Sequence, residues 1–62
     1  MNPTETAAFE AWQSVNAATF HLLMAHKYGA KDSAKIARDY LTEAVARLDA
    51  VLPAPVTEGT PV

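Results

Sequence analysis

The positions of its glycines and prolines restrict this chain to two long helices. Pro3 stands near the start, and Gly29 lies in the middle. The other helix-breaking residues gather at the end of the chain: Pro53, Pro55, Gly59 and Pro61. Between these points the sequence is rich in alanine, leucine, glutamate, lysine and arginine, which favour helix. We therefore predict an all-α protein that folds as an antiparallel two-helix hairpin.

The first helix is expected from about residue 3 to residue 28. Asn2 can cap its N-terminus, Pro3 suits the first helical position, and Glu5 has the spacing of a capping box. Gly29 can adopt the left-handed conformation that commonly ends a helix. At a rise of 1.5 Å per residue, this helix would be about 39 Å long.

A second helix is expected from about residue 33 to residue 52, after a turn at about 29–32. Asp32 or Ser33 is the expected N-terminal cap, and Pro53 is the expected stop, because proline disfavours helix in the residue before it. Residues 1–52 then form the hairpin, and residues 53–62 form a flexible, proline-rich tail.

Both helices carry small and apolar residues at alternating spacings of three and four, as a seam between helices requires. In the first helix these residues are Ala8, Ala11, Val15, Ala18, Leu22 and Ala25. In the second they are Ala34, Ala37, Leu41, Ala44, Leu48 and Val51. A fold point at Gly29 and Ala30 would set each large residue opposite an alanine. This alternation predicts a closely packed, alanine-rich heptad seam.

The largest apolar side chains lie outside that seam, on a second stripe. A chain of 62 residues buries only about 60% of its unfolded surface, and this one has no cysteine to add a disulfide. A single hairpin would therefore leave aromatic rings in water, so we expect a homo-oligomer, most simply a dimer forming a four-helix bundle. The expected oligomer interface consists of Phe9, Trp12, Asn16, Phe20, Leu23, Ile36 and Tyr40.

Four of the five basic residues gather around the expected turn, although the chain as a whole carries a net charge of −2. They are Lys27, Lys31, Lys35 and Arg38, called the basic cluster below. One interpretation is an ordinary charged turn, in which Lys35 pairs with Asp39 one helical turn away. The other is an anion site for nucleic acid or a small nucleotide, aided by the positive end of the second helix.

The sequence offers no constellation of residues for catalysis or for a cofactor. His21 and His26 are five residues apart, about 140° around a helix, whereas two metal ligands on a helix prefer three or four. Neither Ser14 nor Ser33 belongs to a recognisable nucleophile motif. Glu43 and Arg47, four apart, have the spacing of a surface ion pair. We expect no enzyme, no metal and no cofactor.

Composition narrows the setting and leaves two functional interpretations open. No apolar run approaches the ~20 residues of a membrane span, and "MNPTET" lacks the pattern of a signal peptide, so we expect a cytoplasmic protein without membrane contact. The leading interpretation is a small helical interaction protein that self-associates and binds or regulates another macromolecule, a phage or mobile-element accessory protein being one candidate. The alternative is a binder of nucleic acid or a nucleotide through the basic cluster.

Overall fold

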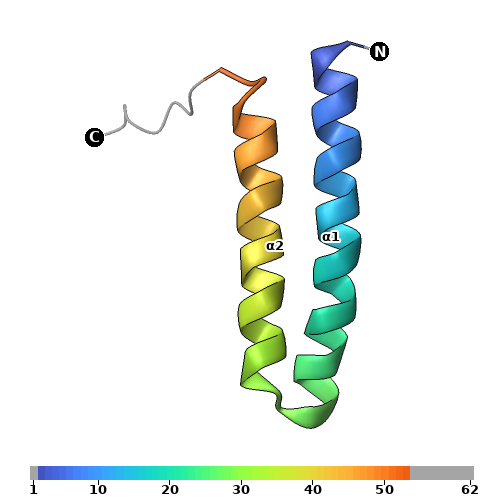
Figure 1. The fold of residues 1–62 in the computed structure, drawn as a ribbon, viewed down its shortest axis with the longest axis vertical. Helices are drawn as coiled ribbons and strands as arrows, with labels where there is room; N and C mark the ends of the chain where they lie inside the picture. Colours follow the sequence, from blue (N-terminus) through green and yellow to red (C-terminus); the bar gives the residue numbers. More distant parts are fainter. Residues whose placement is uncertain (1, 54–62) are drawn as a thin grey trace, which may run out of the picture.

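Two helices, α1 (Pro3–Tyr28) and α2 (Lys31–Asp49), make up nearly all of the structure, a computed structural model that describes residues 2–53. They run antiparallel, side by side, and a short turn joins them at one end of the hairpin (Figure 1). The expected all-α hairpin is confirmed. The flexible tail expected at 53–62 lies, apart from Pro53, outside the described residues.

Helix α1 begins and ends as its sequence predicts. The side chain of Asn2 accepts a hydrogen bond of 2.8 Å from the backbone N–H of Glu5, and the Glu5 carboxylate accepts one of 3.0 Å from the N–H of Asn2. At the other end Gly29 is left-handed, with φ of 63°, and its N–H donates to the carbonyl of Ala25 at 2.8 Å. The capping box and the glycine thus satisfy backbone groups that a helix end leaves unpaired.

Helix α2 differs from the prediction at both ends. It starts at Lys31 with Ala30 as its N-cap, which has no side-chain hydrogen bond, so the expected caps Asp32 and Ser33 are wrong. One left-handed glycine reverses the chain, and the helix restarts at once, which places both residues inside its first turn. The helix also ends at Asp49, about a turn before the expected residue 52.

The helices meet along alanines, but they are rotated relative to the predicted seam. Ala11, Ala18, Ala37 and Ala44 are buried as expected, and Ala18 and Ala37 have no exposed surface. The other buried residues of α1 are Ala7 and Ser14.

The large seam residues are turned outward. Val15, Leu22 and Leu41 remain 40%, 47% and 38% exposed, and Ala8 and Ala34 are exposed too, so this part of the predicted seam is wrong. The physical reason is close approach: side chains of alanine size let two helix backbones come near each other, and larger side chains then fit only beside the contact line.

The register along the helix axes agrees with the predicted fold point. Arg47 bonds Glu10, and the ring of His21 stacks on that of Tyr40 with centroids 5.9 Å apart. The sequence midpoints of these two pairs fall on either side of the fold point at Gly29 and Ala30. The prediction therefore placed the helices correctly along their length and erred in their rotation.

Candidate interaction surfaces

The buried stripe divides the hairpin into two faces of different chemistry. Each residue of a helix is turned about 100° from the one before, so residues that follow a stripe residue lie on one side of it and residues that precede one lie on the other. Glu10 directly precedes Ala11, and Arg47 directly precedes Leu48. Glu10 and Arg47 are hydrogen-bonded to each other. The preceding sides of α1 and α2 therefore share one face, and the following sides share the opposite face.

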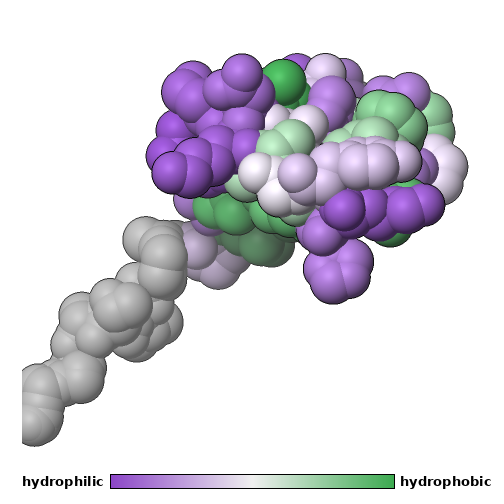
Figure 2. Space-filling view, turned by 90° about the horizontal axis from the view of Figure 1, so that it is seen from below, coloured by the Kyte–Doolittle hydropathy of each residue, from purple (hydrophilic) through white to green (hydrophobic). Residues whose placement is uncertain are grey.

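The following sides form what we term the apolar face. Trp12 follows Ala11, and Val45 follows Ala44; each is 58% exposed. Figure 2, which looks onto the turn end, shows hydrophobic side chains at the surface between polar groups, including a patch along the lower edge of the body. The apolar face comprises Ala8, Trp12, Val15 and Leu22 from α1, and Ala34, Leu41 and Val45 from α2.

The expected oligomer interface is only partly brought together. Trp12 lies on the apolar face, whereas Leu23 and Asn16 are exposed on the outer side of α1. Phe9 and Phe20 each come two residues after a buried alanine and so point away from α2. The ring of Phe9 lies 5.8 Å from that of Trp12, so the aromatic surface continues around the outer side of α1.

Ile36 and Tyr40, the two α2 members of that set, lie on the opposite side of the hairpin. Ile36 precedes Ala37, and Tyr40 packs on His21. The structure therefore does not join them to Trp12 in one surface. On the Trp12 side, the exposed surface of α2 comes instead from Leu41 and Val45. Leu41 lies three residues before buried Ala44, and Val45 directly follows it.

The preceding sides form the ionic face, with Arg47 at its centre. The Arg47 guanidinium donates hydrogen bonds of 2.8 Å to Glu10 of α1 and to Glu43 of α2. The bond to Glu43 and the charge of Glu10 raise the pKa of Arg47 above its ordinary value. The Glu43–Arg47 pair confirms the sequence prediction, whereas the link to Glu10 ties the two helices together and was not anticipated.

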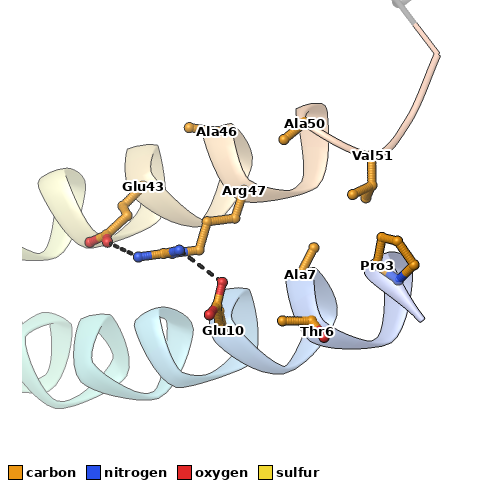
Figure 3. A pocket seen from close by; sticks show the side chains of 9 residues that line it. All are labelled: Pro3, Thr6, Ala7, Glu10, Glu43, Ala46, Arg47, Ala50 and Val51. Atoms are coloured by element: carbon orange, nitrogen blue, oxygen red, sulfur yellow. Dashed lines mark hydrogen bonds and ion pairs between the residues drawn. The ribbon is translucent and has the colours of Figure 1, made fainter. Parts of the chain in front are cut away.

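An open groove of about 740 Å³ lies where the ends of α1 and α2 meet, beside this ion cluster. Figure 3 shows Arg47 reaching across it to Glu10, with small side chains on both walls. The groove offers shape and an ion cluster of one arginine and two carboxylates, which together carry a net charge of −1. Its lining residues are Pro3, Thr6, Ala7, Glu10, Glu43, Ala46, Arg47, Ala50 and Val51.

The basic cluster does not converge on one point. Lys35 and Arg38 both approach Asp39, with nitrogen–oxygen distances of 3.5 Å. Lys27, two residues after Ala25, points away from α2, whereas Lys31 and its neighbours point away from α1. The Lys27 ammonium lies 6.0 Å from the centre of the Tyr28 ring. The helix pair thus stands between Lys27 and the other three.

The two contacts missed from the sequence share one signal. Glu10 with Arg47, and His21 with Tyr40, are each placed at nearly equal distances on the two sides of the fold point. Both pairs lie along the edge of the contact line that the two helices form in the structure. A seam drawn through Ala7, Ala11, Ser14 and Ala18 would have placed them opposite one another.

No group of three or more histidine, cysteine or acidic side chains within residues 2–53 is placed to hold a metal ion. His21 instead makes aromatic contacts, edge-on to Phe20 at 5.2 Å and stacked on Tyr40. Neither described helix has the length and apolar character needed to cross a membrane.

Comparison with known proteins adds no relative to this picture: no family model, curated protein or solved structure matches the chain. The two faces of the hairpin are therefore the basis for assigning a role.

Proposed function

We propose that this protein is a small non-enzymatic interaction protein that works as a homo-oligomer, most simply a dimer of hairpins in a four-helix bundle. The observation that carries the proposal is the exposure of its large apolar side chains. Phe9, Trp12 and Phe20 are all more than half exposed, while every fully enclosed side chain of the described chain is an alanine.

The energetics favour association of such a surface. Burying a large aliphatic or aromatic side chain contributes about 1.5–3 kcal/mol relative to leaving it in water. A seam of alanines supplies little of this, so the helix pair alone has a thin core. Association through Trp12, Val15, Leu41 and Val45 would give the hairpin the core that it lacks.

The aromatic edge of the surface supports a second role, binding of another macromolecule. Phe9 and Phe20 lie on the outer side of α1, where a partner hairpin packed on the apolar face covers them least. Exposed aromatic rings next to an apolar patch are typical of protein-binding surfaces. We assign the apolar face to self-association and the outer aromatic rings to a further partner.

The basic cluster gives weaker support to the alternative, a binder of nucleic acid. Lys35 and Arg38 share Asp39, and Lys27 points in another direction. A phosphate group bound there would therefore contact Lys31 and only some of the other residues of the basic cluster.

Fluorescence of Trp12, the only tryptophan, tests the proposal directly. At high micromolar concentration the emission should be that of a buried indole, and dilution to the nanomolar range should shift it to longer wavelength. The matched control is the double variant Trp12→Phe with Gln13→Trp, which moves the indole to the ionic face, because Gln13 directly precedes buried Ser14. Its emission should stay that of an exposed indole throughout. Exposed emission from Trp12 at every concentration would refute self-association through this face.

A further inference from the structure

The charges that border the apolar face differ between its two ends. At the open end, where the chain termini lie (Figure 1), the bordering charges are acidic: Glu5 lies seven residues before Trp12, and Asp49 lies four after Val45. At the turn end they are basic: Arg38 follows Ala37, and Lys31 lies seven residues before Arg38. Spacings of four and seven keep these residues near the same helix face.

The same asymmetry holds for the two halves of the described hairpin. The half nearer the turn, residues 16–42, carries four basic and two acidic side chains, a net charge of +2. The half nearer the open end, residues 2–15 and 43–53, carries four acidic side chains and one basic, a net charge of −3. The hairpin is therefore a rod with one positive and one negative end.

We propose that a second copy of this chain docks on the apolar face in antiparallel orientation, with its turn over the open end of the first copy. This inference rests on the proposed function. It adds which face the two copies share and how they are oriented relative to each other. A parallel dimer would bring two positive ends together and two negative ends together, and like charges at close quarters disfavour that arrangement. The antiparallel dimer pairs each positive end with a negative one.

A two-fold axis across the middle of the apolar face produces this antiparallel arrangement for both helices. Helix α1 then lies against α1 of the second copy, so that the acidic end of one α1, with Glu5, lies beside the turn end of the other. In the same way α2 lies against α2, so that Asp49 approaches Arg38. An isologous contact of this kind uses one surface twice, and both sets of charges are matched by symmetry.

Spin-label distances measure the orientation. The chain has no cysteine, so the variant Lys31→Cys carries one nitroxide near the turn of each copy. In the antiparallel dimer the two labels should be on the order of 35 Å apart, because they sit near opposite ends of a rod of about 39 Å. In a parallel dimer, neighbouring helices about 10 Å apart would bring the labels to short distances. The same label at Thr42, midway along the hairpin, serves as the control and should give a short distance.

A pair of matched variants tests the face. Val45 and Ile36 are both exposed β-branched residues of α2, on the apolar and the ionic face respectively. Val45→Glu should weaken dimerisation at least tenfold in sedimentation, and Ile36→Glu should leave it within about twofold, with helix content checked by circular dichroism.

The outcomes separate the two proposals. A wild-type chain that sediments as a monomer refutes the proposed function itself. A dimer whose Lys31 labels lie close together keeps that function but refutes the antiparallel orientation. A dimer that tolerates Val45→Glu and is lost with Ile36→Glu refutes the choice of face.

Discussion

At the scale of single residues, alanine controls how the two helices meet. Ala18 and Ala37 are fully enclosed between them, and no large side chain of the described residues is enclosed to that degree. The contact is therefore set by close backbone approach, and one added methylene or methyl group at the contact line must push the helices apart.

Replacing Ala18 with leucine should destabilise the protein by about 1–3 kcal/mol, because the larger side chain overpacks the seam. Urea denaturation followed by circular dichroism, at matched protein concentration, measures the change. Ala46→Leu is the control: Ala46 is exposed, two residues after Ala44, so leucine should be tolerated there. Equal stability of the two variants would mean that the alanines do not form the seam.

Among the residues that the structure describes, the bond between Arg47 and Glu10 is the ion pair that links the two helices. Its contribution to the free energy of unfolding is expected to be small. Both side chains are more than one-third exposed, so a double-mutant cycle with Arg47→Met and Glu10→Gln should give only the small coupling of a surface ion pair, and that coupling should fall with added salt. A raised arginine pKa stabilises the fold at every pH below the ordinary arginine value and is lost only above the raised value. Arginine deprotonation should therefore cause no loss of this coupling near neutral pH, and a cycle showing such a loss contradicts the assignment.

At the scale of elements, the two helices differ in how well their ends are satisfied. Helix α1 has a complete capping box and a left-handed glycine, whereas α2 starts at Ala30 with no side-chain cap. Ala30 already has the extended backbone of an N-cap, with φ of −82° and ψ of 105°. Only the side-chain oxygen is missing.

Replacing Ala30 with serine should therefore stabilise the protein by about 0.5–1 kcal/mol, because its hydroxyl can accept a bond from the first turn of α2. Thermal denaturation would show a raised midpoint. Ala34→Ser, four residues inside the same helix, provides the contrast and should be neutral or mildly destabilising. A lower midpoint for Ala30→Ser would show that this site cannot act as a cap.

The elements were predictable where local chemistry alone decides them. Asn2, Glu5 and Gly29 define α1 through contacts within a few residues, and both ends were predicted correctly. The start of α2 was not, because Asp32 and Ser33 look like caps in sequence, while the sharp reversal at Gly29 lets the helix begin earlier. The rotation of the seam was missed because Ala7 and Ala8 are indistinguishable by residue type, and only the packing of both helices selects between their faces.

At the scale of the whole molecule, the hairpin encloses small residues and exposes large ones. Helices with Trp12, Val15, Leu41 and Val45 on one side and an ion cluster on the other have the pattern of a half-bundle. The polarity of charge along its length adds a direction to that surface. The proposed self-association through the apolar face would account for the amount of apolar surface that the described hairpin keeps outside its own core.

Sedimentation equilibrium of the full chain is the most direct test of this account. We expect a mass that is a multiple of the 6.7 kDa chain, most simply twice that value, at micromolar concentration and in both low and high salt. The apolar contact should persist when ionic attraction is screened. A mass of 6.7 kDa at all micromolar concentrations, with helix content intact, would contradict the account.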